Sequence, residues 1–262
     1  MSNVPFKCPL ACTLRLFAGI AVLTLASVMT PANAAVTFSG HAAGNDAGET
    51  NSATVTFALT VSGTTTDLVV TLTNTANYKP NDGPDMLTAV FFTLTGDPTL
   101  SKISALLNTN SVGVENGATL TVPGGVVGGS WAYAAGLSGA PGGANEGISA
   151  AGFSWFGPGN LFPGSALPGD SGPDGVGGAL TTAVDDGSKY NGGLKGRPFI
   201  MDSAVFTLGD VPASFNLSQI SGVGFAYGTM PDQIIATVPE PSAIALAGAG
   251  LLFVGVFGRR RR

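Results

Sequence analysis

The sequence predicts an all-β fold, an antiparallel β-sandwich or jelly-roll-like domain. Apolar residues alternate with Thr and Ala over Val55–Val61 and again over Leu68–Leu72. A period of two is typical of strands with one buried face. Turn-forming residues separate these runs, most densely in the Asn-, Asp-, Gly- and Pro-rich stretch Asn74–Asp85. A helical pattern is nearly absent from the central region, where Leu100–Leu107 is a weak helix candidate.

The strands follow from this alternation in chain order. The first begins at Val36, and the second and third form a hairpin around a turn at Ser62–Thr66. Later strand candidates share β-branched and aromatic residues between turn signals. They are Thr88–Thr95, Ala118–Val122, Ser130–Tyr133, Ile200–Leu208, Gly222–Tyr227 and Gln233–Val238.

Residues 123–197 differ from the rest, because Gly and Pro occur throughout and Gly-Gly pairs repeat. The section is too long for an ordinary loop. Its aromatic residues, among them Trp131, Phe153 and Phe162, are unusual for a disordered linker. We expect irregular but partly packed loops with one or two strands, and a flexible Gly-rich insertion is the alternative.

Residues 1–34 have the three-part plan of a secretory signal peptide. Lys7 and Arg15 precede the apolar run Leu16–Val28, and Ala32-Asn33-Ala34 supplies the small-residue cleavage site. We therefore expect export through the secretion translocon and cleavage by signal peptidase before Ala35. Both cysteines of the chain, Cys8 and Cys12, fall inside this segment, so the exported domain over 35–237 would have no thiol.

The carboxyl-terminal tail, residues 238–262, combines three elements in a fixed order. Val238-Pro239-Glu240-Pro241 comes first, and its prolines exclude the interior of a helix. An apolar stretch at about 242–257 follows, which as a helix spans about 24 Å and predicts a single transmembrane helix. Arg259, Arg260, Arg261 and Arg262 then stay on the cytoplasmic side as a stop signal.

These three elements resemble the PEP-CTERM sorting signal. The resemblance covers about the last 25 residues and implies a destination for the chain, with Val238, Pro239, Glu240 and Pro241 as recognition residues. It implies that an exosortase, a multi-spanning membrane transpeptidase, recognises the tail and processes the chain near Pro-Glu-Pro. It further implies a Gram-negative host with exopolysaccharide and biofilm systems, and an inner-membrane-anchored precursor that passes to the cell surface or extracellular matrix.

The exported middle is strongly acidic. It retains only five basic residues once both ends are set aside: Lys79, Lys102, Lys189, Lys195 and Arg197. An acidic surface repels phosphates, so nucleic acid is excluded as a partner.

Acidic residues in the turns raise the question of a cofactor. Calcium prefers several hard oxygen ligands, which carboxylates in Gly-rich loops can supply. Full calcium-loop patterns are missing, and Asp is also an ordinary turn residue. We therefore expect no cofactor, with calcium as the weaker alternative at three pairs: Asp82 with Asp85, Asp170 with Asp174, and Asp185 with Asp186.

A catalytic centre finds little support in the sequence. Gly169–Pro173 resembles the nucleophile segment of chymotrypsin-like proteases around Ser171, but it lacks one glycine, and His41, the only histidine, lies in the wrong context. The turn carboxylates could form a glycosidase pair only if they lie within about 10 Å of each other. The aromatic side chains of Trp131, Tyr133, Trp155 and Phe156 could stack on sugars, although core packing explains them better.

Two functions therefore stay open. The favoured one is a non-catalytic exported surface or extracellular-matrix protein that contacts exopolysaccharide. The alternative is a secreted carbohydrate-active enzyme or a calcium-dependent carbohydrate-binding module. The lack of a cysteine nucleophile and of a positioned histidine base favours the first.

Overall fold

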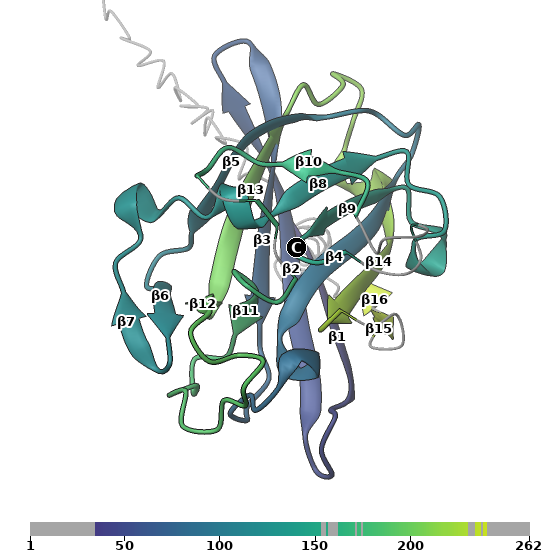
Figure 1. Cartoon of the computed structure of the whole chain (residues 1–262). Helices are drawn as coiled ribbons and strands as arrows, with labels where there is room; N and C mark the ends of the chain where they lie inside the picture. Colours follow the sequence, from purple (N-terminus) through teal and green to yellow (C-terminus); the bar gives the residue numbers. More distant parts are fainter. Residues whose placement is uncertain are drawn as a thin grey trace, which may run out of the picture. The chain divides into compact units, whose positions relative to one another are not determined.

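A computed structural model describes residues 35–152, 156, 162–170, 172–173, 175–229, 234–236 and 238–239 (Figure 1). All of them fall within one structural unit of the chain, Asn33–Arg262. The expected signal peptide, residues 1–34, and the expected transmembrane helix at 242–257 lie outside the described residues. None of the described segments is a helix long and apolar enough to cross a membrane.

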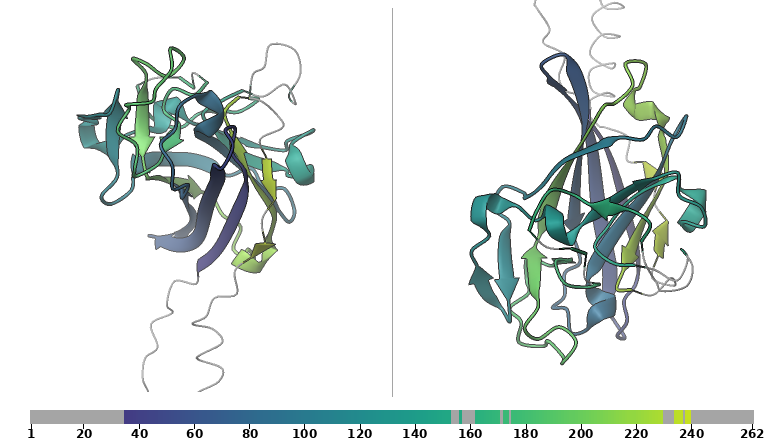
Figure 2. Two further views of the ribbon diagram at one scale, coloured as in Figure 1. Left: turned by 90° about the horizontal axis from the view of Figure 1, so that it is seen from below. Right: turned by 45° about the horizontal axis from the view of Figure 1, so that its top comes forward.

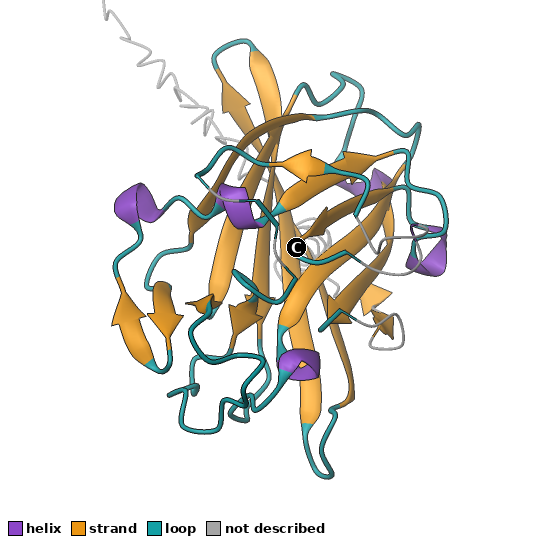
Figure 3. Ribbon diagram, in the orientation of Figure 1, coloured by secondary structure: helices purple, strands orange, loops and turns teal. Residues whose placement is uncertain are grey.

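Strands dominate the described residues, and the helical segments are short 3-10 turns (Figure 3). The first sheet has six strands in the order β16-β1-β2-β3-β13-β5. Their bounds are β1 Ala35–Ala43, β2 Thr50–Ser62, β3 Thr65–Asn74, β5 Ser101–Leu107, β13 Ser203–Gly209 and β16 Val238–Pro239. The predicted all-β class is confirmed.

The second sheet has ten strands. Eight follow the order β10-β8-β9-β4-β11-β12-β6-β7, while β14 pairs with both β4 and β15. The strands are β4 Leu87–Leu94, β6 Val112–Glu115, β7 Ala118–Leu120, β8 Ala132–Ala135, β9 Glu146–Ser149, β10 Ser165–Ala166, β11 Leu180–Thr181, β12 Pro198–Met201, β14 Ile220–Tyr227 and β15 Ile234–Ala236. The 3-10 turns are η1 Gly83–Asp85, η2 Pro123–Gly125, η3 Gly128–Ser130, η4 Pro141–Gly143 and η6 Leu217–Gln219.

The two sheets share one hydrophobic core, and the views of Figure 2 show them on either side of it. Residues of β2 alternate between buried and partly exposed, as a period-two strand requires. Phe57 of β2 contacts Phe92 of β4 in the opposite sheet, with 5.1 Å between ring centroids. Trp131 contacts Phe206 of β13 at the same centroid distance. Aromatic contacts of this kind stabilise the packing of the two sheets by more than the burial of their apolar area alone.

Strand β4, Leu87–Leu94, is buried on both faces, which its apolar run Ala89–Phe92 explains. Val90 and Phe92 point into the shared core, whereas Phe91 belongs to a second cluster. Phe156 and Phe162 from the Gly- and Pro-rich section cover Phe91 at 6.2 Å and 6.4 Å. That section therefore covers the outer face of the second sheet, and its described part carries four short strands where one or two were expected.

The predicted strand Ile200–Leu208 is two strands in different sheets. Asp202 separates β12 from β13 with a φ of 84°, a left-handed conformation that Asp tolerates better than most residues. The chain thereby passes from the second sheet to the first. The backbone of Asp202 bonds to both: its N–H donates to Thr181 O, and its carbonyl accepts from Asn74 N–H.

Two further expectations were wrong. The weak helix candidate Leu100–Leu107 is strand β5, because pairing with β13 outweighs a helical signal that lacks caps. The pairing is also not wholly antiparallel, since β11 runs parallel to β12. Residues 182–197 connect these two strands and supply the long crossover that parallel neighbours need.

Candidate functional site

Two loops meet at one end of the first sheet and carry four carboxylates. The β1–β2 loop holds Asp46 and Glu49, and the loop that ends in η1 holds Asp82 and Asp85 (Figure 1). Side-chain hydrogen bonds join the loops: Asn45 Nδ2 donates to Asp82 Oδ2 at 3.0 Å, and Asn81 Nδ2 donates to Asp46 Oδ2 at 2.6 Å. We call these four residues the two-loop acidic cluster.

Asp85 is the most buried member of the two-loop acidic cluster, with a relative exposure of 0%. Its Oδ2 accepts from the backbone N–H of Asn81 at 2.8 Å and of Asp82 at 3.2 Å. These bonds follow from the 3-10 turn, in which Asp85 reaches back to the residues that precede the turn. The other oxygen, Oδ1, is buried without a hydrogen-bond partner, as are Asp82 Oδ1 and Glu49 Oε2.

The carboxylates of the two-loop acidic cluster repel one another. Burial raises the pKa of Glu49, and the charges on Asp85 and Asp46 raise it further, while Lys189 lowers it to a lesser extent. The pKa of Asp82 is also raised, mainly by burial and then by the charges on Asp85 and Asp46. Protein cations therefore compensate this cluster poorly, and it would gain stability from an added positive charge.

Tyr78 lies beside the cluster. Burial first and the charge of Asp85 second raise its pKa well above the usual range. Its hydroxyl donates to Asn51 Oδ1. A side-chain interaction with Asp85 also contributes to the raised pKa. A hydroxyl has one proton to give, and with that proton on Asn51 no hydrogen bond of normal geometry reaches Asp85 Oδ1.

The predicted acidic pair Asp185 and Asp186 has protein partners. Asp185 accepts from the hydroxyls of Thr181 and Tyr190 and from Gly187 N–H. Asp186 bonds to Lys79 and Ser188, and the hydrogen bond from Lys79 is the main reason that its pKa is lowered. These contacts give Asp185 and Asp186 a structural role in the β11–β12 connection.

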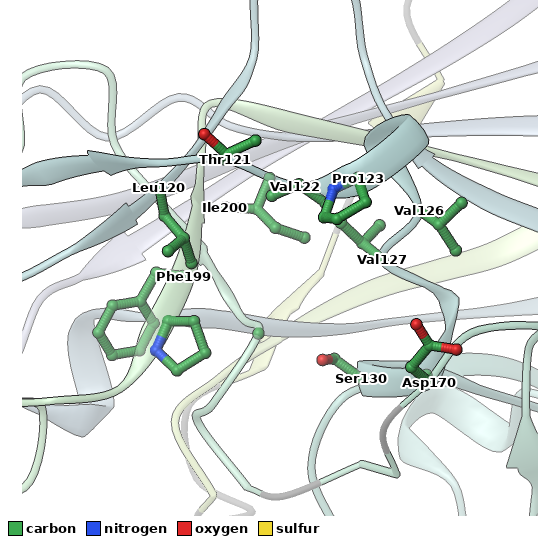
Figure 4. Close-up of a pocket in the computed structure, with 13 residues that line it drawn as sticks. Leu120, Thr121, Val122, Pro123, Val126, Val127, Ser130, Asp170, Phe199 and Ile200 are labelled. Atoms are coloured by element: carbon green, nitrogen blue, oxygen red, sulfur yellow. The ribbon is translucent and has the colours of Figure 1, made fainter.

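Asp170 lies elsewhere and lines a largely apolar pocket of about 220 Å³. Ser130 also lines this pocket, and Val122, Val126 and Phe199 contribute to its apolar lining (Figure 4). Its proposed companion Asp174, and Ser171 of the protease-like segment, lie outside the described residues. His41 belongs to β1 and does not line this pocket.

Across the part of the chain that the structure describes, no three His, Cys, Asp or Glu side chains are gathered closely enough to form a ready-made metal site. The sequence pointed to Asp82 and Asp85 but missed Asp46 and Glu49. These two lie more than 30 residues earlier, and the pairing of β1 with β2 and of β2 with β3 brings them close. The Gly-Asn-Asp turn composition at residues 44–46 was the available signal.

The aromatic candidates belong to the interior. Trp131 has a relative exposure of 0%, and its Nε1 donates to Gly178 O at 3.0 Å. Tyr133 is buried in the same core, and Phe156 packs on Phe91. Sugar stacking is therefore wrong for Trp131 and Tyr133, because their rings face the core and not a surface. Trp155 lies outside the described residues.

A buried carboxyl that the sequence did not single out is Glu146 in β9. Tyr133 donates to its Oε2 at 2.5 Å, and its Oε1 has no hydrogen-bond partner. Burial raises the pKa of Glu146 to about 8 and Asp97 adds to the rise, whereas the hydrogen bond from Tyr133 opposes it. The group lies inside the core and therefore bears on stability.

The sorting tail begins inside the fold. Val238 and Pro239 form strand β16, which pairs with β1 through Ser39 and Phe38 respectively. The remaining recognition residues, Glu240 and Pro241, and the four arginines lie outside the described residues, as do Ala32 and Ala34 of the expected cleavage site. Ala35, the expected new amino terminus, is the first residue of β1.

A family model for the PEP-CTERM protein-sorting motif matches residues 237–262. No curated protein matches the chain, and no solved structure does. The match covers the three elements seen in the sequence, and it meets the described domain at β16. The chain therefore carries a PEP-CTERM protein-sorting motif at its carboxyl-terminal end, which marks it as an exosortase-targeted protein of the cell surface.

Proposed function

We propose that this protein is a non-catalytic surface or extracellular-matrix protein of a Gram-negative bacterium, whose jelly-roll-like β domain contacts exopolysaccharide in a biofilm. The observation that carries the proposal is the sorting motif over residues 237–262. The domain would be made as an inner-membrane-anchored precursor, with its acidic β domain outside and Arg259–Arg262 inside. Exosortase would then release or transfer it.

The arrangement of the described carboxylates supports a non-catalytic role. A glycosidase needs two carboxyl groups on either side of a bound sugar, with one of them able to donate a proton. The described lining of the apolar pocket contributes one carboxylate, Asp170. Glu146, whose raised pKa would suit a general acid, is fully buried and bonded to Tyr133.

The alternative, a secreted carbohydrate-active enzyme or a calcium-dependent carbohydrate-binding module, draws on the two-loop acidic cluster. Asp82 and Asp85 lie three residues apart on one turn, and Asp82 N–H bonds to Asp85 Oδ2 at 3.2 Å. The charge of Asp85 raises the pKa of Asp82, and two carboxylates that repel each other in this way suit a shared cation. The enzyme reading is therefore the weaker of the two.

Mass spectrometry of both termini in the native host tests the proposal. We expect a chain that starts at Ala35 and ends near Pro239–Pro241 in the wild-type strain. In an exosortase deletion strain the carboxyl terminus should stay intact. If Arg262 were intact in both strains, the tail would be a plain membrane anchor and the sorting role would be wrong.

Binding to polysaccharide is tested separately, by co-sedimentation of the processed protein with exopolysaccharide from the same host. We expect retention by this polymer and much weaker retention by a neutral glucan of similar size. Equal retention by both polymers, or by neither, would contradict the matrix contact. Release of reducing ends during the incubation would instead favour the enzyme.

A further inference from the structure

We propose that the two-loop acidic cluster is a calcium site, in which Asp82, Asp85 and Glu49 bind one ion through the oxygens that have no protein partner. Calcium takes six to eight hard oxygen ligands and tolerates irregular geometry. Three carboxylates on two loops provide such ligands, and water completes the shell. The site would join the β1–β2 loop to the η1 turn, independently of how the chain is sorted.

The first step of the argument is the orientation of Asp85. Its Oδ2 is fixed by the N–H groups of Asn81 and Asp82, so the side chain is held in one rotamer. Its Oδ1 is fully buried without a donor. An unsatisfied buried carboxylate oxygen costs a protein several times more than a normal hydrogen bond returns, and a bound cation removes that cost.

The second step is the number of such oxygens. Asp82 Oδ1 and Glu49 Oε2 are also buried without partners. For both carboxylates, Asp85 is the charged group that raises the pKa most. Three of the four buried partnerless side-chain atoms among the described residues therefore lie in this one cluster. The fourth belongs to Glu146, in the core.

The third step concerns the supporting contacts. Asn45 fixes Asp82 through Oδ2, and Asn81 fixes Asp46 through Oδ2. These amides hold the acidic loops against each other without occupying the partnerless oxygens. Asp46 is thereby an outer carboxylate that adds negative charge, which is the arrangement that strengthens calcium sites.

The carboxylates do not yet converge on one point. Like charges repel one another, and a bound cation would remove that repulsion. Glu49 lies next to Gly48 in a loop whose backbone bonds are Gly44 N–H to Glu49 O and Glu49 N–H to Asp46 O. We infer that the β1–β2 loop moves a short way toward η1 when calcium binds.

Thermal unfolding of the chain as its native host exports it, in nonionic detergent and after treatment with EDTA, tests the site. With calcium chloride raised to about 10 mM, well above the roughly 0.1–1 mM Kd of extracellular calcium modules, the melting temperature should rise by about 3–5 °C. Magnesium should give a much smaller rise, because it demands octahedral geometry. Sodium chloride of equal ionic strength controls for charge screening.

Three variants locate the effect. Asp82→Asn and Glu49→Gln each remove one proposed ligand. Each should lower the affinity for calcium at least about tenfold, as measured by isothermal titration calorimetry. Both also relieve repulsion, so their melting temperatures in EDTA should equal or exceed that of the wild type, which shows that they fold. Asp170→Asn is the matched control, because it removes the same charge from an exposed position outside the cluster.

The proposal fails if the wild type shows neither a shift nor heat of binding at the highest calcium concentration. It also fails if Asp82→Asn and Glu49→Gln respond as the wild type does, or if magnesium or sodium gives an equal shift. In any of these cases ordinary water satisfies the buried oxygens. Loss of the response in Asp170→Asn alone would place the ion elsewhere and overturn the assignment.

Discussion

At the residue scale, Glu146 makes stability depend on pH. Its pKa is about 8 in the folded chain against a usual value of 4.5. Between these values the folded state binds a proton that the unfolded state has lost, so stability must fall as the pH rises from about 4.5 to about 8. The neutral variant Glu146→Gln keeps the bond from Tyr133 without this charge. We expect it to be more stable than the wild type at pH 9, by at least about 2 kcal/mol, and similar to it at pH 5.

Urea unfolding at pH 5, 7 and 9 measures this difference. Glu115→Gln is the control, because it makes the same change of charge on β6, where the side chain is partly exposed. Asp97 is the charged group that faces Glu146 and stays in place in both variants. Parallel pH profiles for Glu146→Gln and the wild type would contradict the prediction.

A second residue-scale prediction concerns Gly117, in the β6–β7 turn. Its φ is +76°, and an added Cβ would lie 1.6 Å from Asp186 O, a backbone atom that cannot move away freely. Gly117→Ala should therefore cost at least about 3 kcal/mol, through strain and a backbone clash together. Gly142→Ala has a similar φ of +64° and open space, so it should cost only about 1 kcal/mol. Equal losses in urea unfolding would mean that the clash is absent.

At the element scale, the two sheets depend on aromatic contacts between them. Phe57 of β2 is fully buried and contacts Phe38 of β1 and Phe92 of β4. Phe57→Ala should lower the free energy of unfolding by about 3–5 kcal/mol, because the cavity lies between the sheets. Val61→Ala on the same strand removes a side chain that is 74% exposed and should change it by less than about 0.5 kcal/mol. Similar losses for the two variants, measured by thermal or urea unfolding, would argue against a shared core.

The strands that the sequence located correctly are those with a simple alternation. β2 and β3 bury every second residue against one core, so their pattern is local. β5 and the β12–β13 pair were misjudged for a different reason. β5 is an edge strand with an exposed Ile103, so it lacks the alternation. The break between β12 and β13 depends on the left-handed conformation of Asp202, which an Asp in the sequence does not by itself indicate. In both cases pairing with neighbouring strands, which the local sequence does not show, determined the structure.

The same difference separates the two parts of the site. The tail motif is continuous in the sequence, so Val238, Pro239, Glu240 and Pro241 could be read directly. The two-loop acidic cluster is discontinuous, and only Asp82 and Asp85 share a turn. Asp185 and Asp186 have equally suggestive spacing, yet they bond to Tyr190 and Lys79. Acid spacing alone cannot distinguish a carboxylate with a partner from one without.

At the scale of the whole molecule, the two expected processing points lie at the same sheet edge. β1 begins at Ala35, and β16 pairs with β1 at Phe38 and Ser39 before the chain enters the sorting motif. Signal removal and sorting would therefore act on neighbouring strands. The hydrophobic core is built from residues between Phe38 and Tyr227, so the domain can hold its fold whichever end is processed.

Because the hydrophobic core is separate from the sorting motif, the substitution Glu240→Ala should affect sorting in the native host without affecting the fold. The substitution changes the sorting motif beyond the last described strand, so the melting temperature of the β domain should match the wild type within about 1 °C. Processing should nevertheless stop, and the full-length precursor should collect in the inner membrane with Arg262 intact. Membrane fractionation and mass spectrometry of the carboxyl terminus measure this, with Glu115→Ala as the control for loss of a glutamate elsewhere. A processed Glu240→Ala chain at the surface would show that exosortase recognises the prolines and the anchor without this carboxylate. A lowered melting temperature would mean that the tail contributes to the fold.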